Sequence, residues 1–217
     1  MYKWHSINLL SENMSKTRER TEQKLVSATR VVLDREGYKD ITVEKITKEA
    51  KVAYGTFYNY FSSLEDAHEA AVTSIIREKA EQWLVDSQGE ESPLLRIFEA
   101  LFQLFLVFEN SPSLDWVIER PLILHRVYKN TSERAMEDLV IQAIRKGELP
   151  QPELDTLVHF RNARDTVRWG QMGAFRRLGN GEDLKKVYIE YFSTLNIFNL
   201  PPEKVRELLY FTVSKHV

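Results

Sequence analysis

Apolar side chains recur at the spacing of an α-helix along nearly the whole of this 217-residue chain. Only eight glycines and seven prolines interrupt the pattern, and no segment alternates apolar and polar residues for long enough to indicate a sheet. The sequence therefore predicts an all-α fold of about nine or ten helices. Their expected positions are 16–36, 42–50, 53–60, 62–87, 92–109, a helix between 113 and Pro121, 132–147, 152–178, 183–198 and a last short helix after 203.

Capping residues support several of these boundaries. Gly37 is placed to end the first long helix, and Thr42 is placed to cap the second helix. Ser62, with Glu65 three residues later, has the pattern of a capping box. Ser92 and Pro93 have the pattern of an N-cap followed by the first helical residue.

The composition excludes several classes of protein. The chain has no cysteine, so disulfides, thiolate catalysis and cysteine-ligated zinc are excluded. It has no apolar run of 18 residues, so we expect no membrane span. The first ten residues lack the features of a signal peptide, so we expect a cytoplasmic protein. The five histidines form no His-x-x-x-His pair, and we expect neither a metal nor a cofactor.

Charge is distributed unevenly along the chain. The formal net charge is −2, but residues 15–61 hold ten basic and seven acidic residues, while residues 62–217 hold 19 basic and 24 acidic ones. A basic N-terminal part on an acidic body favours a polyanion as partner of the basic part. Met14 is a plausible alternative start, so we interpret residues 1–14 as an extension without a role in the fold.

Two short helices joined by a tight turn follow the first long helix, which is the pattern of a helix-turn-helix. The second short helix lies in "KVAYGTFYNYF" (51–61), which holds five aromatic residues and one glycine. Phe57 and Phe61 are spaced to pack inward together. Tyr54, Tyr58 and Tyr60 either belong to the same core or offer hydroxyl groups to DNA. A helix of two turns cannot bury all its faces, which favours DNA for some of these rings.

The segment "ITVEKITKEAKVAYGTFYNYFSSLEDA" (41–67) resembles the DNA-binding domain of the TetR family of transcriptional regulators. The residues that match the family pattern at fixed spacing are Thr42, Ile46, Ala50, Val52, Gly55, Thr56, Phe57, Tyr58, Tyr60, Phe61 and Glu65. The chain departs from that pattern in having Lys51 at the usual turn glycine, Thr47 at a usual alanine, Ala53 at a usual serine and Leu64 at a common lysine. These departures affect the expected DNA affinity and footprint.

The resemblance implies an N-terminal three-helix helix-turn-helix domain at 15–66, with the motif at about 42–61, and a helical effector-binding and dimerisation domain at 67–217. It also implies a ligand-responsive regulator, most often a repressor, that binds a palindromic operator in double-stranded DNA. Thr42 and Tyr58 are then expected to hold phosphates, and Tyr54, Gly55 and Thr56 to lie nearest the bases. The further expected contacts are Lys45, Lys51, Ala53, Asn59 and Tyr60.

The remaining three-quarters of the chain contains a helix, 94–109, that is apolar on all sides. Such a helix is buried, either as plain core or as part of the wall of an apolar cavity for a small apolar or aromatic effector. The expected wall residues are Trp83, Phe98, Phe102, Phe105, Trp116, His125 and Trp169.

The resemblance implies a homodimer through the helices at 152–178 and 183–198. In the second of these, Leu184, Val187, Tyr188, Tyr191, Phe192, Leu195 and Phe198 form a broad apolar face. That face either pairs with its twin or packs inside the monomer. Two other functions stay open: a helical interaction module that has lost specific DNA binding, and, less favoured, an all-helical enzyme. No catalytic triad or glycine-rich phosphate loop supports the enzyme, so we expect none.

Overall fold

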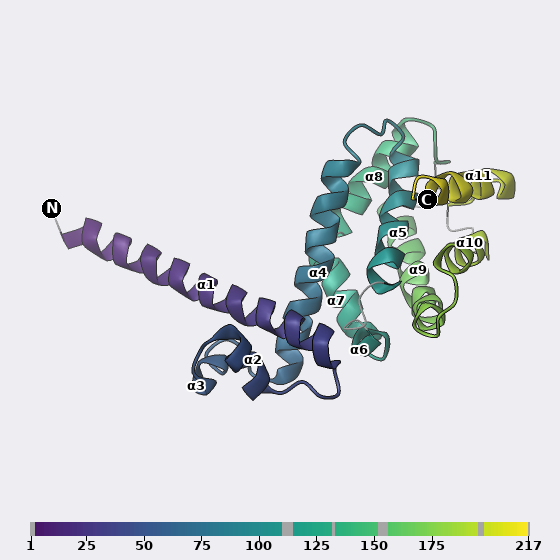
Figure 1. Ribbon diagram of the computed structural model, residues 1–217. Coiled ribbons are helices and arrows are strands. Elements are labelled where there is room, and N and C mark those ends of the chain that lie inside the picture. Colours follow the sequence, from purple (N-terminus) through teal and green to yellow (C-terminus); the bar gives the residue numbers. More distant parts are fainter. Residues whose placement is uncertain (1–2, 110–114, 132, 152–155, 195–197, 217) are drawn as a thin grey trace. The chain divides into compact units, whose positions relative to one another are not determined.

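The computed structural model describes residues 3–109, 115–131, 133–151, 156–194 and 198–216. These residues form eleven α-helices and no strand, which confirms the all-α prediction (Figure 1). The helices are α1 (Lys3–Glu36), α2 (Val43–Ala50), α3 (Tyr54–Phe57), α4 (Leu64–Asp86), α5 (Pro93–Glu109), α6 (Asp115–Ile118), α7 (Pro121–Thr131), α8 (Glu133–Arg145), α9 (Thr156–Gly179), α10 (Leu184–Thr194) and α11 (Pro202–Ser214). The chain forms two compact units, Met1–Ser74 and Ile75–Val217.

Two helices, α1 and α7, begin at other residues than the sequence predicts. Pro121 was expected to end a helix but begins α7, because the first helical position needs no N–H donor. This adds one helix to the expected number. The first helix begins at Lys3 and not at Lys16. No glycine or proline occurs between these positions, so nothing in the sequence stops the helix there.

The first unit has its own hydrophobic core. Leu25, Val32, Ile46 and Phe57 are buried in it, together with Ala67 and Ala71 from the first turns of α4. Because these turns of α4 complete the core, the unit extends to Ser74, beyond the predicted boundary at 66.

The N-terminal cap of α4 lies one residue later than the predicted capping box. The Ser63 hydroxyl accepts a hydrogen bond from the Asp66 N–H at 3.1 Å. The Asp66 carboxylate in turn accepts the Ser62 N–H at 3.1 Å. Its hydrogen bond with the Ser62 side chain is the main cause of the lowered pKa of Asp66. Glu65, the predicted partner, is exposed.

The second unit is built around α5. Ser92 caps this helix as predicted, since its hydroxyl accepts the Leu95 N–H at 3.1 Å. The Glu148 carboxylate, beyond the end of α8, accepts the Leu94 N–H at 2.9 Å and so joins α8 to the start of α5. In the middle of α5, the Phe98 carbonyl accepts the buried Tyr188 hydroxyl of α10 at 2.7 Å.

The helices α9 and α10 approach closely at Gly170. The Tyr191 hydroxyl of α10 donates to the Val167 carbonyl of α9 at 2.6 Å. A Cβ atom at Gly170 would lie 2.5 Å from that hydroxyl oxygen. The absence of a side chain at Gly170 therefore allows this hydrogen bond between the helices.

None of the described helices is long and apolar enough to cross a membrane. Among the same residues, no cluster of three or more acidic or histidine side chains has the arrangement of a metal site.

Candidate nucleic-acid interface and apolar cavity

The helix α2 has an ordinary N-terminal cap and an unusual residue at its C-terminal end, where the turn to α3 begins. Thr42 caps α2, and its hydroxyl accepts the Lys45 N–H at 3.3 Å. At the other end Lys51 has φ 56° and ψ 45°, the left-handed conformation that favours glycine. This conformation lets the N–H of Val52 reach the Thr47 carbonyl at 3.0 Å. A non-glycine residue there costs about 1 kcal/mol.

The aromatic residues after this turn have two different environments. Phe57 is fully buried, and its ring centroid lies 5.5 Å from that of Phe61. Tyr54 and Tyr58 are 55% and 52% exposed, and their hydroxyl oxygens lie 3.3 Å apart. Tyr60 is half-buried against the core. The two phenylalanines therefore pack inward as predicted, and the Tyr54–Tyr58 pair does not belong to the core.

The helix α3 covers only Tyr54–Phe57, and residues 58–60 form a turn instead of the predicted helical end. Ala53 stands at the N-cap without a side-chain hydrogen bond. Gly55 is exposed, and an added Cβ would meet no atom within 4 Å. The surface at this residue is open to a close partner.

The ten predicted DNA contacts lie in one unit along α2, the turn and α3. Seven are exposed: Thr42, Lys51, Ala53, Tyr54, Gly55, Tyr58 and Asn59. The half-buried ones are Lys45, Thr56 and Tyr60. The Lys45 ammonium donates to the Asp40 carbonyl at 2.7 Å and forms an ion pair with Glu36. The hydrogen bond between the Lys45 ammonium and the Glu36 carboxylate is the main cause of the lowered pKa of Glu36.

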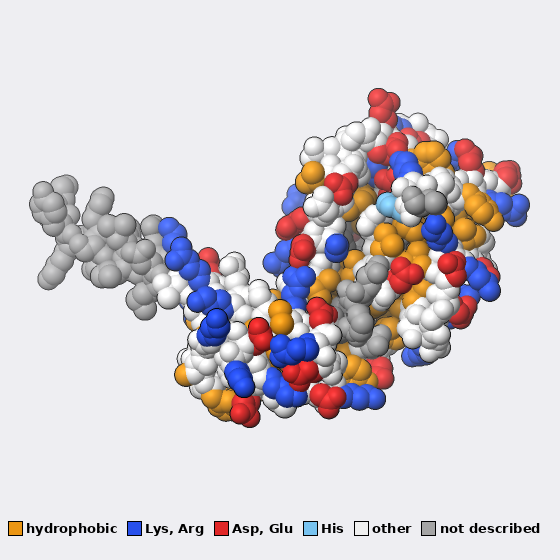
Figure 2. All heavy atoms as spheres, in the orientation of Figure 1, with side chains coloured by type: hydrophobic (Ala, Val, Ile, Leu, Met, Phe, Trp, Pro, Cys, Tyr) orange, Lys and Arg blue, Asp and Glu red, His pale blue; other side chains and the backbone are white. Residues whose placement is uncertain are grey.

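Further basic residues lie on α1. Lys16, Arg18, Arg20 and Lys24 are exposed, and Figure 2 shows lysine and arginine side chains along the described part of this helix. The uneven charge of the chain was the only sequence signal for them.

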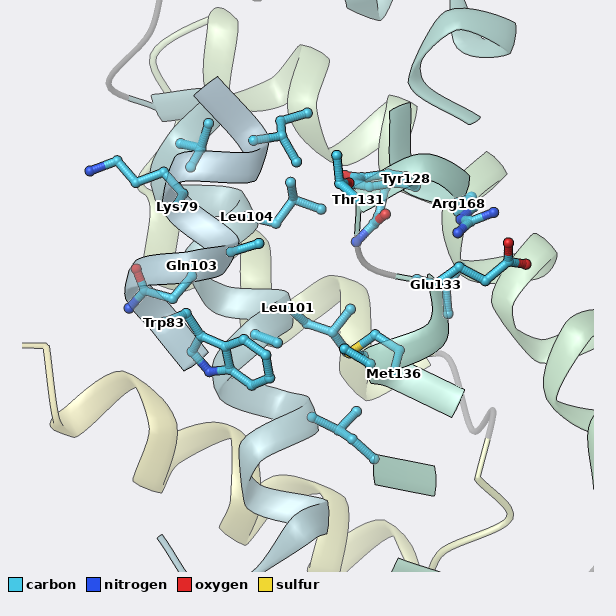
Figure 3. A pocket seen from close by; sticks show the side chains of 18 of the residues that line it. Lys79, Trp83, Leu101, Gln103, Leu104, Tyr128, Thr131, Glu133, Met136 and Arg168 are labelled. Carbon is cyan, nitrogen blue, oxygen red and sulfur yellow. The ribbon is translucent and has the colours of Figure 1, made fainter. Parts of the chain in front are cut away.

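The second unit contains a cavity of about 140 Å³ between α4, α5, α7, α8 and α9 (Figure 3). Its wall is mostly aliphatic. The lining includes Ile76, Leu84, Ile97, Ala100, Leu101, Leu104, Val107, Met136, Val140 and Val167. Small and medium-sized side chains on this face of α5 leave room that phenylalanines would fill.

Some polar groups of the cavity wall have no partner within the protein. The Tyr128 hydroxyl, Gln171 Nε2 and Trp83 Nε1 are buried without a hydrogen bond among the described residues, and all three residues line the cavity. The Arg168 guanidinium lies 5.3 Å from the centroid of the Tyr128 ring. Burial raises the pKa of Tyr128 well above its usual value, so this phenol stays neutral.

Of the seven predicted wall residues, the cavity includes only Trp83. Phe98, Phe102 and Phe105 lie on the other side of α5, where they pack against the rings of α10. The reason is that an all-apolar helix does not indicate in its sequence which side faces a cavity. The other three lie elsewhere, since Trp116 is buried beside Arg120, the His125 ring contacts Arg168, and Trp169 is 55% exposed.

Comparisons with known proteins agree with this architecture. Residues 25–70 match the family model described as bacterial regulatory proteins, tetR family. A search of curated protein sequences found no match.

Several solved structures share the fold at low sequence identity. RolR in complex with resorcinol has a TM-score of 0.74 at 15% identity, over 90% of this chain and 95% of its own. FadR, a fatty acid degradation regulator from Bacillus halodurans, has a TM-score of 0.54 at 20% identity, over 86% and 96%. A gamma-butyrolactone receptor has a TM-score of 0.52 at 18% identity, over 92% and 98%.

These likenesses extend across both units, whereas the family model covers the helix-turn-helix and its flanks. The resemblance indicated by residues 41–67 is thus confirmed: residues 25–70 match the model of the tetR family, and the chain shares the fold of these solved structures.

Proposed function

We propose that this protein is a DNA-binding transcriptional regulator, a repressor that a small apolar or aromatic effector releases from a palindromic operator. The observation that carries the proposal is the exposed Tyr54–Tyr58 pair, preceded in the sequence by the exposed Lys51, on a domain that matches the tetR-family model. Hydroxyl groups and lysines are the side-chain types that hold DNA phosphates.

The proposed roles within this surface follow from exposure. Tyr58 and Thr42 are the proposed phosphate contacts, and Lys51 adds an exposed charge in the turn between α2 and α3. Tyr54, Gly55 and Thr56 are proposed to lie nearest the base edges in the major groove. Lys45 supports the surface electrostatically, because its ammonium is already held by Asp40 and Glu36.

The cavity of the second unit is the proposed effector site. It is lined mainly by aliphatic residues and carries a few polar groups, as small-molecule sites usually do. RolR, which shares the fold, has been crystallised with resorcinol, a small aromatic molecule. The helix α4 gives Ala67 and Ala71 to the core of the first unit and Ile76 and Trp83 to the cavity wall. An effector in the cavity would therefore contact a helix that is also part of the DNA-binding unit.

A homodimer through α9 and α10 completes the proposal, since a two-fold dimer matches a palindromic operator. The apolar face of α10 is not available for this pairing, because Leu184, Val187, Tyr188 and Phe192 are buried inside their own subunit. We propose that the outer side of α9, with the exposed Trp169, takes its place.

A gel-shift experiment with the DNA upstream of the protein's own coding sequence tests this function. The full chain is expected to retard that DNA, and a cell extract that contains the effector is expected to weaken the complex. The Tyr54→Ala/Tyr58→Ala variant should lose the shift, whereas Tyr210→Ala, an equally exposed tyrosine of α11, should retain it. An unaltered shift with the double variant would rule out this surface as the DNA-binding site.

A further inference from the structure

We infer that the effector is a single-ring aromatic compound with a neutral hydroxyl group, and that Tyr128 and Gln171 recognise this hydroxyl. The inference deepens the proposed function and rests on it only for the consequence of binding on DNA. Binding itself depends on the cavity alone.

The volume of the cavity limits the ligand to about one ring. The cavity measures about 140 Å³, and an engineered protein cavity of about 150 Å³ holds one benzene molecule. In Figure 3, Leu101, Leu104 and Met136 lie across the middle of this space, with the ring of Trp83 at one side. Apolar side chains around a space of this size favour a flat apolar ring over an extended chain or a fused ring system.

Two buried polar groups determine what the ring must carry. The Tyr128 ring comes from α7 and the Gln171 amide from α9, and both line the same cavity. The Tyr128 hydroxyl and Gln171 Nε2 are completely shielded from solvent, and neither has a hydrogen-bond partner among the described residues. Buried donors without partners are rare because they lose their hydrogen bonds to water on folding.

A hydroxyl oxygen on the ligand fits both groups. It can accept from Gln171 Nε2–H and can either accept from or donate to the Tyr128 hydroxyl. A ligand without a polar atom would leave both groups unpartnered, so the cavity discriminates against it.

The charges beside this polar end favour a neutral ligand. Arg168 and Glu133 both line the cavity, and Figure 3 places their side chains on the side where Tyr128 lies, so their charges offset one another there. The Arg168 guanidinium also faces the Tyr128 ring, and its Nη1 lies 3.4 Å from Nδ1 of His125. Burial keeps the Tyr128 phenol itself uncharged. A carboxylate at this position would therefore lack a dedicated cation, whereas a hydroxyl needs none.

Calorimetric titration of the full chain with phenol, toluene and benzoate tests the inference. These probes share one ring and differ in carrying a hydroxyl, a methyl or a carboxylate. Phenol is expected to bind about tenfold more tightly than toluene, the difference that one or two net hydrogen bonds provide, and benzoate more weakly than phenol.

Two variants identify the residues. Tyr128→Phe and Gln171→Met remove the polar atoms and nearly conserve volume. Each is expected to lower phenol affinity by about three- to tenfold and to leave toluene affinity unchanged. Tyr210→Phe is the matched control, because this tyrosine of α11 is exposed and does not line the cavity.

The stability of the free protein provides a second readout. Because Tyr128→Phe removes a buried hydroxyl without a partner, its Tm should stay equal to that of the original chain or rise by roughly 2–4 °C. A lower Tm together with unchanged phenol affinity would show that the hydroxyl has a structural role and would overturn the assignment.

The other outcomes separate this inference from the proposed function. Equal affinities for phenol and toluene, or tightest binding of benzoate, would overturn the neutral-hydroxyl recognition even if the chain binds its DNA. If phenol binds as expected but the chain retards no DNA, the recognition stands and the regulatory function fails. If phenol binds and also weakens the DNA complex, both are supported.

Discussion

Lys51 combines a backbone conformation that favours glycine with a charge at the proposed DNA surface. Its φ of 56° is unfavourable for a residue with a side chain, and the residue is exposed in the turn that precedes Tyr54. We expect Lys51→Gly to stabilise the first unit by about 1 kcal/mol, because glycine adopts this conformation without steric cost. We expect the same change to lower the salt dependence of DNA binding by about one unit of slope.

Lys51→Ala separates the two effects of this change. Alanine keeps the steric cost and removes the charge, so the slope should fall in the same way while the free energy of unfolding stays unchanged. Urea unfolding and a salt titration of the gel shift measure the two quantities. If both variants retain the original salt slope, Lys51 makes no phosphate contact.

Tyr58 provides a second prediction at the scale of one residue. Its hydroxyl lies 3.3 Å from that of Tyr54 and is exposed. We expect Tyr58→Phe to change the free energy of unfolding by less than about 0.5 kcal/mol, as is usual for surface substitutions. DNA affinity should fall several-fold for operator and unrelated DNA alike, because a phosphate contact carries no sequence information. A loss confined to the operator would instead place Tyr58 at a base edge.

At the scale of the elements, local sequence signals predicted the ends of helices better than they predicted which face of a helix lines the cavity. Thr42 and Ser92 cap α2 and α5 as expected, because capping depends only on residues within the same turn. Asp66 replaced the expected Glu65 as the capping partner of α4 because both acids stand within the first turn, and their sequence positions differ by one residue.

The residues of the cavity could be predicted only in part. The cavity wall was predicted on the aromatic side of α5. The cavity instead lies against the opposite side of this helix, at Ile97, Ala100, Leu101 and Leu104. Tyr128 and Gln171 gave no signal in the sequence, since each stands alone in a helical pattern. Their significance comes from burial without a partner, which depends on the packing of distant segments.

The contact between α9 and α10 yields a prediction from two glycines in one helix. Gly170→Ala would place a Cβ 2.5 Å from the Tyr191 hydroxyl oxygen, whereas Gly173→Ala would meet no atom within 4 Å. Gly173→Ala should therefore stabilise the protein by about 0.5–1 kcal/mol through helix propensity. Gly170→Ala must displace the hydroxyl that bonds to the Val167 carbonyl, and we expect it to be at least about 1 kcal/mol less stable than Gly173→Ala.

Chemical unfolding of the two variants under identical conditions checks this difference. Tyr191→Phe in the Gly170→Ala background should reduce it, because the oxygen at 2.5 Å is then absent. Equal stability of the two alanine variants would show that the helices move apart without cost at Gly170.

At the scale of the whole molecule, the charge differs between two parts of the chain. The basic excess lies in residues 15–61 and the acidic excess in residues 62–217. An acidic body repels DNA phosphates, so nucleic acid should bind through the N-terminal unit alone. A dimer would double the number of basic surfaces available to one DNA molecule without any change in the sequence.

The proposed dimer can be tested through Trp169. Trp169 is exposed on α9 in the single chain. Because aromatic residues are enriched in interfaces, we expect a dimer that pairs this helix to bury Trp169. We expect light scattering at micromolar concentration to give twice the chain mass of 25.5 kDa. Trp169→Glu should shift the mass toward the monomer and weaken operator binding, because a charge would then be buried at the interface. Tyr210→Glu, on the exposed side of α11, should leave both quantities unchanged. A chain that is monomeric at this concentration would contradict the dimer, and a dimer that tolerates Trp169→Glu would place the interface away from the outer side of α9.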